Sequence, residues 1–285
     1  MKIKEYRTQF IQELISIYGS DEAESFFYLV LESKNKLKKL DLALQPDLVF
    51  SLDDIQFWNS ILDSLKQEIP IQYLLGVTRF YGLDFEVNPA VLIPRPETEE
   101  LVEWIIESRS SKTESQGKFK VLDIGTGSGC IAISLAKNCS DVEVFAIDIS
   151  EKALATAQKN AQKNGVNVIF FQKNILETDD LLQQFDLIVS NPPYVRVLEK
   201  SEIKKNVLDF EPHLALFVSD DDALVFYKKI AELAQKNLSL NGQLFFEINQ
   251  YLGKEMIDLL QKMNFKNIEL RKDIYGNDRM IRAEI

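Results

Sequence analysis

The sequence predicts an α/β protein with a mostly parallel sheet and a small helical domain ahead of it. Three observations lead to this prediction. From residue 118 onward, short apolar runs alternate with helical patterns, an order that is typical of βαβ units. Before residue 75, apolar residues recur at helical spacing. The last two apolar runs lie close together, across residues 272–278, which favours an antiparallel hairpin at the edge of the sheet.

We expect residues 1–75 to form a small helical bundle. Its first helix carries apolar residues at helical spacing between Phe10 and Tyr18. The spacing Asp21-x-x-Glu24 can open a second helix, and Ser51-x-x-Asp54 can cap a further one. Gln45-Pro46-Asp47 interrupts the helical pattern between them.

Residues 76–96 are expected to link this bundle to the rest of the chain as a β-hairpin. Apolar and polar residues alternate in this segment, and a turn is expected near Gly82. A second domain would span residues 97–285, beginning with a helix and containing the sheet. Within it, we expect the polar tract 109–118 to be a surface loop.

The domain of residues 97–285 contains the predicted alternation of strands and helices. Strands are predicted at residues 119–124, 142–148, 167–172, 185–190, 242–248, 266–271 and 279–284. Helices are predicted at residues 129–137, 151–164, 222–239 and 252–263. Because helices separate most of the strands, neighbouring strands should run parallel.

The charge of the chain argues against some classes of function. Its 285 residues carry a formal net charge of −11. Nucleic acids are bound mainly by neutralising phosphates, so we expect no direct nucleic-acid binding from an acidic chain without a basic stripe. No apolar run approaches the length of a membrane span, and the N-terminus lacks the apolar core of a signal peptide. We therefore expect a soluble, cytoplasmic protein without a membrane partner.

The cysteines and the histidine restrict the chemistry further. Cys130 and Cys139 have no metal-binding spacing, and His213 is the single histidine. We therefore predict no metal site. Histidine is the commonest general base near neutral pH. A mechanism that needs such a base would have to use His213, which we expect in a surface loop.

The segment Asn191-Pro192-Pro193-Tyr194 follows a predicted buried strand. The prolines end that strand because they have no N–H to donate, and Pro192 holds Asn191 in an extended conformation. Ligands of open α/β sheets bind at the carboxyl ends of the strands. The Asn191 side chain and the Pro192 carbonyl can both face one small ligand, with Tyr194 as a flat lid. Taken alone, the segment is equally compatible with a proline-rich turn.

Residues 121–132 predict a strand, a glycine loop and the start of a helix. The loop reads Gly125-Thr126-Gly127-Ser128-Gly129. Its glycines let the backbone approach a ligand closely, and the helix N-terminus offers N–H groups to a negative group. A dinucleotide fingerprint would need a third glycine where Cys130 stands. The form Gly-x-Gly-x-Gly is typical of methyltransferases that use S-adenosylmethionine.

Two further polar residues end strands of the same sheet. Asp148 closes the second strand, where a carboxylate can accept hydrogen bonds from both hydroxyls of a ribose. NAD enzymes also place an acid here, so Asp148 indicates a ribose and leaves the cofactor open. Asn174 closes the third strand, where an adenine amine is usually met, and it can equally be a cap at the strand end. Together with Asn191, these groups should surround one crevice.

The chain also carries several longer signatures. They are Pro70–Gly76, Leu92–Glu99, the glycine loop, Asn191–Tyr194, Phe210–Pro212 and Tyr275–Arg279. On these segments the chain resembles, over nearly its whole length, the PrmC/HemK family of protein-(glutamine-N5) methyltransferases. The sequence Ile-Pro-Arg-Pro-Glu-Thr-Glu at residues 93–99 is the most specific of them. Asn-Pro-Pro-Tyr is shared with DNA adenine methyltransferases and other amino-methyltransferases.

The resemblance implies a Rossmann-like, class I fold that binds S-adenosylmethionine at Gly125–Gly129, Asp148, Asn191 and near Asn174. It implies that Asn191–Tyr194 hold a substrate glutamine, with Asn191, Pro192 and Tyr194 as catalytic residues. That glutamine would belong to the Gly-Gly-Gln motif of class I peptide chain release factors. The products would be N5-methylglutamine and S-adenosylhomocysteine, and the helical domain would help to dock the release factor.

Two departures from the family pattern are visible. Asn249 stands where the family usually has glycine, and Asn174-Ile175 replaces an acidic–aromatic pair that is found in some members. Both concern the edge of the cofactor site or local packing more than the type of reaction.

Two other functions stay open. The first is a nucleic-acid adenine-N6 methyltransferase, which could hold an exocyclic amine with the same acceptors after base flipping; the acidic charge argues against it. The second is a catalytically silent S-adenosylmethionine-binding subunit that serves protein interactions. The intact Asn191 and Tyr194 argue against this second possibility.

Overall fold

The computed structural model describes residues 1–110 and 118–285, and by its internal contacts the chain forms two compact units. The helical unit comprises Met1–Gly76 with Lys205–Phe210, and the sheet unit comprises Val77–Lys204 with Glu211–Ile285. The surface loop expected at residues 109–118 falls mainly on residues 111–117, outside the described residues. In the described part of the chain, no helix combines the length and the apolar character needed to cross a membrane.

The helical unit is built from short helices around an aromatic core. The helices are α1 (Ile3–Tyr18), α2 (Ser20–Val30), η1 (Leu31–Asn35), α3 (Lys39–Leu44), α4 (Leu52–Lys66), α5 (Ile71–Leu75) and α9 (Lys205–Phe210). The indole of Trp58 is fully buried and contacts the rings of Phe10 and Phe27 at centroid distances of 5.6 and 4.8 Å. Aromatic pairs of this kind contribute about 0.5–1.5 kcal/mol beyond the burial of their area.

The start of α4 matches its predicted cap. The Ser51 hydroxyl accepts a hydrogen bond from the backbone N–H of Asp54 at 3.0 Å, and the Asp54 carboxylate accepts the N–H of Ser51 at 3.1 Å. The hydrogen bond from the Ser51 hydroxyl lowers the pKa of Asp54. The predicted start of the second helix is wrong by two residues, because its N-cap is Gly19 and not Asp21. Gly19 lies between α1 and α2, so α2 begins at Ser20 and Glu24 instead pairs with Arg7 at 2.7 Å.

The sheet unit begins with a hairpin and continues as alternating strands and helices. Its strands are β1 (Val77–Phe80), β2 (Leu83–Glu86), β3 (Phe119–Ile124), β4 (Val142–Asp148), β5 (Ile169–Gln172), β6 (Phe185–Ser190), β7 (Val195–Arg196), β8 (Phe217–Val218), β9 (Leu238–Glu247), β10 (Lys266–Lys272) and β11 (Asp278–Glu284). Its longer helices are α6 (Pro96–Ser110), α7 (Cys130–Asn138), α8 (Glu151–Asn164), α10 (Val225–Asn237) and α11 (Gly253–Lys262). Short turns are η2 (Ile175–Glu177), η3 (Val197–Glu202), η4 (His213–Ala215) and η5 (Asp220–Asp222).

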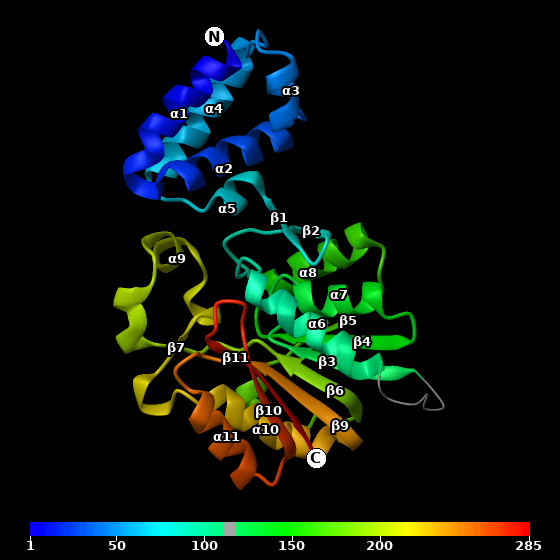
Figure 1. Ribbon diagram of the computed structural model, residues 1–285. Coiled ribbons are helices and arrows are strands. Elements are labelled where there is room, and N and C mark those ends of the chain that lie inside the picture. Colours follow the sequence, from blue (N-terminus) through cyan, green and yellow to red (C-terminus); the bar gives the residue numbers. More distant parts are fainter. Residues whose placement is uncertain (111–117) are drawn as a thin grey trace. The chain divides into compact units, whose positions relative to one another are not determined.

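The main sheet has the order β10-β11-β9-β6-β3-β4-β5. The strands β9, β6, β3, β4 and β5 run parallel, whereas β11 is antiparallel to both β9 and β10. The predicted mostly parallel sheet with a final antiparallel hairpin at its edge is confirmed. The antiparallel strand itself lies one place inside the edge, between β9 and β10 (Figure 1).

Two boundaries near β9 differ from the prediction. The helix α10 ends at Asn237 rather than at 239, and β9 begins at Leu238 rather than at 242. The hydroxyl of Ser239 donates to the Asp186 carboxylate on β6 at 2.7 Å, which ties this first part of β9 to its neighbour. The contact with Asp186 thus outweighs the helical pattern of this segment. The sequence does not reveal that contact, because the two residues are far apart in the chain.

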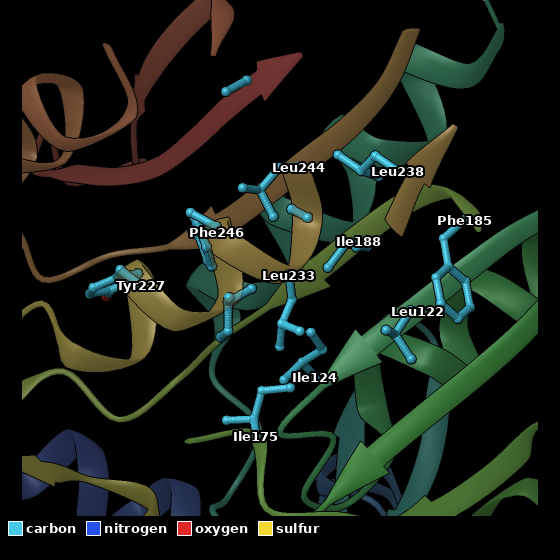
Figure 2. Close-up of a cluster of buried hydrophobic side chains, with 14 of the residues drawn as sticks. Leu122, Ile124, Ile175, Phe185, Ile188, Tyr227, Leu233, Leu238, Leu244 and Phe246 are labelled. Carbon is cyan, nitrogen blue, oxygen red and sulfur yellow. The ribbon is translucent and has the colours of Figure 1, made fainter. Parts of the chain in front are cut away.

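Helices cover both faces of the sheet. On one face, Leu122 and Ile124 of β3 belong to a buried cluster that also contains residues of α10 and α11, and Figure 2 shows this cluster converging from β3, β6, β9 and α10. On the other face, residues of α6, α7 and α8 belong to a second buried cluster, which contains Val121 of the same strand. Successive side chains of a strand point to opposite faces of the sheet. A strand that is buried on both faces, such as β3, therefore needs apolar residues at successive positions. Burial of each such aliphatic side chain stabilises the fold by about 1.5–3 kcal/mol.

The hairpin β1–β2 belongs to the sheet unit by its contacts. Its two-residue turn places Tyr81 and Gly82 at φ 47° and 75°, as the predicted turn near Gly82 requires. The fully buried Asn160 on α8 fixes the hairpin in place. Its oxygen accepts the N–H of Glu86 at 2.6 Å, and its nitrogen donates to the carbonyls of Glu86 and Ser128 at 3.0 and 2.9 Å. One side chain therefore joins the hairpin, α8 and the glycine loop.

Asn160→Ala should lower the free energy of unfolding of the sheet unit by about 2–4 kcal/mol, because three backbone groups lose their partner. Chemical unfolding in a Trp58→Phe background measures this, since Trp104 is then the only tryptophan and lies in the sheet unit. The matched control is Asn138→Ala, which removes one bond to the Ser134 carbonyl. Equal losses in both variants would contradict the role given to Asn160.

Candidate active site

A crevice of about 640 Å³ lies at the carboxyl ends of β3, β4, β5 and β6. Its lining comes from the glycine loop, from the residues after β4, β5 and β6, and from the start of α6. The lining residues include Gly125, Thr126, Gly127, Ser128, Asp148, Ile149, Asn174, Ile175, Asn191, Pro192, Pro193, Arg95 and Thr98. All of them belong to the sheet unit. The predicted polar groups from separate strands thus come together, with one exception described below.

The glycine loop is anchored on β4. The N–H groups of Gly125 and Thr126 both donate to the carbonyl of Ile147, at 2.8 and 3.0 Å. The helix α7 starts directly after the loop, at Cys130, which is one residue later than predicted. The side chain of Cys130 is half-buried beside the crevice.

Position 129 requires glycine for two reasons, its backbone conformation and the closeness of its neighbours. It has φ 84°, a conformation that side chains other than glycine rarely adopt. A Cβ at this position would lie 2.8 Å from Cδ1 of Ile133 and 3.1 Å from Cβ of Ala157. The last glycine of the loop therefore allows α7 and α8 to approach each other closely.

Asp123 is a functional candidate that the sequence did not reveal. It lies within β3 and is fully buried, and its carboxylate accepts the Thr126 hydroxyl at 2.7 Å and the N–H of Ala132 at 3.3 Å. Its other oxygen, Oδ1, has no hydrogen-bond partner. Burial raises the pKa of the Asp123 carboxyl to about 7. The sequence did carry one signal for this residue, because Asp123 is an acid within a strand made mostly of apolar residues.

Asp148 ends β4 and faces the crevice. Its Oδ2 accepts the N–H of Gly127 at 2.8 Å and its Oδ1 accepts the N–H of Ser150 at 2.9 Å. These bonds orient the carboxylate and use two of its roughly four lone-pair positions, which leaves two for further donors. Burial raises the pKa of Asp148, and the hydrogen bonds from the backbone oppose that shift.

Asn174 follows β5 and lines the crevice. Its side-chain oxygen accepts the N–H of Leu176 at 3.1 Å and caps the short turn η2. The structure therefore shows the capping role that the sequence left open for this residue. The side-chain nitrogen is not engaged in that cap.

The segment Asn191–Tyr194 begins where β6 ends. Ser190, the last residue of β6, donates its hydroxyl to the carbonyl of Ile124 at 2.7 Å, which ties the ends of β6 and β3 together. Asn191 donates its side-chain N–H to the hydroxyl of Thr98 at 3.4 Å. Asn191, Pro192 and Pro193 line the crevice.

Tyr194 is the exception among the predicted polar residues, because it is not part of the crevice lining, and Gly129 of the glycine loop is not part of it either. Its hydroxyl donates to Oε1 of Glu247 at 3.0 Å, and its ring packs against the core that contains Tyr227. Burial raises the pKa of the Tyr194 phenol. The sequence predicted Tyr194 as a flat lid, and that role stays a prediction.

Asn249, one of the two departures from the family pattern, supports the backbone of this segment. Its side-chain nitrogen donates to the Tyr194 carbonyl at 3.0 Å and to the Glu199 carboxylate at 2.9 Å. Its oxygen accepts the N–H of Tyr251 at 3.0 Å. A glycine at this position would make none of these side-chain bonds.

Glu211 holds the segment ahead of α6 against the crevice. Its buried carboxylate accepts the N–H of Ile93 at 3.2 Å and a guanidinium N–H of Arg95 at 2.6 Å. The side chain of Glu211 is only 1% exposed. Two signatures that are far apart in the sequence, residues 93–99 and 210–212, therefore meet through one carboxylate.

The remaining candidates lie outside this network. His213 is exposed, as predicted, and its ring contacts Phe217 edge-on at 5.2 Å. Among residues 1–110 and 118–285, no group of three or more His, Cys, Asp or Glu side chains is arranged to hold a metal ion.

The burial of Asp123 generates a prediction for the pH dependence of stability. Between pH 4 and 7 the folded protein holds a proton on Asp123 that the unfolded chain has lost, so rising pH should destabilise the fold. Relative to Asp123→Asn, the wild type should lose about 4 kcal/mol of unfolding free energy across this range. Urea unfolding of both proteins at several pH values, without ligand, measures the difference. If the unfolding free energies of the two proteins changed with pH in parallel, Asp123 would have the same pKa in the folded and the unfolded chain, which would contradict the prediction.

Comparisons with known proteins agree with this architecture. A family model described as "Methyltransferase small domain" matches residues 109–210. A solved structure titled as the T. thermophilus 16S rRNA N2 G1207 methyltransferase (RsmC) in complex with AdoMet and guanosine is similar in fold, with a TM-score of 0.53. It is 21% identical, and the match covers 73% of this chain and 49% of that one.

Close relatives cover the whole chain. The release factor glutamine methyltransferase of Flavobacterium psychrophilum is 65% identical over 285 residues, which is 99% of each chain. The protein of the same name from Bacteroides thetaiotaomicron is 43% identical over 95% of this chain and 96% of that one. This identity extends over both the helical unit and the sheet unit, so the chain belongs to the family of release factor glutamine methyltransferases.

Proposed function

We propose that the protein methylates the side-chain amide nitrogen of the glutamine in the Gly-Gly-Gln motif of class I peptide chain release factors. The methyl donor would be S-adenosylmethionine, and the products would be N5-methylglutamine and S-adenosylhomocysteine. One observation carries the proposal: Asn191 and Pro192 line the same crevice as the glycine loop and Asp148. An acceptor pair for an amide thus lies beside a site suited to the cofactor. The names of the relatives supply the identity of the substrate.

The donors and acceptors of the crevice fit S-adenosylmethionine. The two unused lone-pair positions of Asp148 match the two hydroxyls of its ribose. The backbone of Gly125–Gly129 can approach the rest of the molecule closely. The apolar side chains of Ile149 and Ile175 line the crevice beside Asp148 and Asn174, as an adenine ring requires. Asn174 would complete the adenine end through its side chain.

The substrate amide would be held by oxygen atoms. An amide nitrogen is a weak nucleophile because its lone pair is delocalised into the carbonyl. The side-chain oxygen of Asn191 and the carbonyl of Pro192 would accept its two N–H bonds, which orients the nitrogen and increases its electron density. Tyr194 and Pro193 would border the plane of the amide. The substrate glutamine is thus recognised as a planar group with two donors.

S-adenosylmethionine supplies an electrophilic methyl group on a sulfonium centre. The residues of this chain contribute alignment, which can lower a barrier by about 7–11 kcal/mol in favourable cases. The oxygens of Asn191 and Pro192 face the positive charge that develops on the nitrogen. A new N–C bond replaces the S–C bond, and the nitrogen then loses one proton to solvent. Because that proton becomes acidic only after attack, no strong base such as His213 is needed.

We further propose that the helical domain predicted at residues 1–75, which is the main part of the helical unit, docks the release factor, with the hairpin of residues 76–96 as the link to the catalytic domain, residues 97–285. The support is that the helical unit has its own aromatic core and contributes no residue to the lining of the crevice. Its contribution to the reaction would therefore be to the binding of the protein substrate. As the substrate works in translation, we expect the reaction in the cytoplasm, with no metal and no nucleic acid bound directly.

The function is tested with labelled S-adenosylmethionine and three acceptors: a class I release factor, its Gly-Gly-Gln→Gly-Gly-Ala variant, and DNA. We expect label only on the intact release factor. Label on DNA would favour an adenine methyltransferase. No label on any acceptor, with cofactor binding intact, would favour a silent interaction subunit.

Asn191→Ala should lower kcat on the release factor by at least about 10³-fold, because both the alignment of the amide and one acceptor of its N–H are lost. The dissociation constant for S-adenosylhomocysteine should change little. Asn138→Ala serves as the control and should keep wild-type turnover. Full activity of the Asn191 variant would remove Asn191 from the mechanism.

Asp148→Ala should raise the dissociation constant for S-adenosylhomocysteine by about 10- to 100-fold, since two hydrogen bonds to a charged group are lost. Isothermal titration calorimetry measures the change directly. The control is Asp179→Ala, which removes an exposed acid paired with Lys229. An unchanged constant in the Asp148 variant would mean that the ribose is held elsewhere.

A further inference from the structure

A chain of hydrogen bonds leads from β9 to Asn191. Thr98, in the first turn of α6, donates its hydroxyl to Oε2 of Glu247 at 2.6 Å. Asn191 in turn donates its side-chain N–H to the same hydroxyl of Thr98 at 3.4 Å. Glu247 also accepts the Tyr194 hydroxyl at 3.0 Å on its other oxygen. Thr98 and Glu247 are 2% and 1% exposed, so water does not compete for these bonds.

The direction of each bond follows from the one before it. A carboxylate has no hydrogen to give, so Glu247 can only accept. Thr98 has a single hydroxyl hydrogen, which Glu247 takes, and its oxygen can then only accept from Asn191. Asn191 must therefore turn its nitrogen towards Thr98 and its oxygen away from it. Burial raises the pKa of Glu247, and the hydrogen bond from Thr98 and the charge of Arg279 oppose that shift.

This direction matters because the two ends of an asparagine amide have nearly the same shape. A half-turn of the Asn191 amide would exchange oxygen for nitrogen with little steric cost. In the proposed reaction only the oxygen is useful, because the substrate nitrogen carries hydrogens. With the nitrogen of Asn191 in that place, two donors would face each other, and the alignment of the substrate would be lost.

We propose that Thr98 and Glu247 are positioning residues that fix the amide of Asn191 with its oxygen towards the substrate, through the directed bonds from Asn191 to Thr98 and from Thr98 to Glu247. The inference rests on the proposed function. It also assigns a role to residues 93–99, which is to position Thr98, since Glu211 holds Ile93 and Arg95 in place ahead of it.

The first test removes the hydroxyl without changing the shape of the side chain. In Thr98→Val, kcat on the release factor should fall on the order of 10²-fold, the effect of a misplaced catalytic group. KM and the dissociation constant for S-adenosylhomocysteine should stay within about twofold, because the proposed contacts of the two ligands do not include this hydroxyl. Thr98→Ser keeps the hydroxyl and should restore most of the activity. Thermal unfolding of both variants separates this effect from a loss of folding.

The second test reverses the direction of the bonds. Glu247→Gln introduces an N–H that can donate to Thr98, so the Thr98 hydroxyl would donate to Asn191 and turn its oxygen away from the substrate. We expect a loss of kcat similar to that in Thr98→Val. The matched control is Glu269→Gln, on the edge strand β10, which changes an acid bonded to Arg271 and Arg282 and should keep wild-type turnover.

A double variant makes this test specific. Asn191→Asp presents an oxygen on both sides, so it needs a donor at Thr98. In the wild-type background this change should lower kcat, because an oxygen then faces the accepting side of Thr98. In the Glu247→Gln background the same change should raise kcat about tenfold, because Thr98 now donates. A purely structural role for Thr98 and Glu247 predicts losses that add in both backgrounds, and that result would overturn the inference.

A readout without turnover separates the inference from the proposed function. In NMR spectra of the wild type, the carboxamide hydrogens of Asn191 should show a nuclear Overhauser effect to the side chain of Thr98, and Glu247→Gln should abolish it. Absence of the effect in the wild type overturns the inference, whatever the activity. A wild type that shows the effect but labels no release factor supports the orientation and overturns the proposed function alone. Wild-type kcat in Thr98→Val overturns the inference while the proposed function stands.

Discussion

The parallel pairing of β3 with β6 is the constraint on which the rest of the catalytic architecture depends. It brings the carboxyl ends of two strands to the same edge, one followed by the glycine loop and the other by Asn191. The bond from the Ser190 hydroxyl to the Ile124 carbonyl fixes how far each strand runs before its loop begins. Helices on both faces bury the two strands, so this register is held by the core as well as by the sheet.

Around that edge, three buried acids have separate tasks. Asp123 holds the turn of the glycine loop by accepting the Thr126 hydroxyl. Glu211 holds the segment before α6 by accepting a guanidinium N–H of Arg95. Glu247 accepts the hydroxyls of Thr98 and Tyr194 near Asn191. A buried carboxylate is costly unless several donors reach it. Each of these acids therefore determines the positions of its donors, and Thr126, Arg95 and Thr98 among those donors line the crevice.

The sequence was sufficient to predict the strands of the main sheet and the helices between them, because burial on two faces leaves long apolar runs with clear periods. It also predicted which strand ends carry the polar residues of the crevice, since Asp148, Asn174 and Asn191 follow directly after those runs. It did not reveal the bond between Glu247 and Thr98, because the two residues are 149 positions apart and nothing local marks the pair. The predicted start of β9 was wrong for the same reason, because Ser239 bonds to Asp186 on another strand.

The place of β11 inside the sheet has a consequence for the newly made chain. Synthesis releases β6 and β9 before residues 278–284, and until then β9 exposes the N–H and C=O groups that later pair with β11. Such an open, apolar edge is a template for pairing with other chains. The nascent sheet therefore passes through a period in which it is prone to aggregate, and that period ends only when its last strand has been translated and inserted.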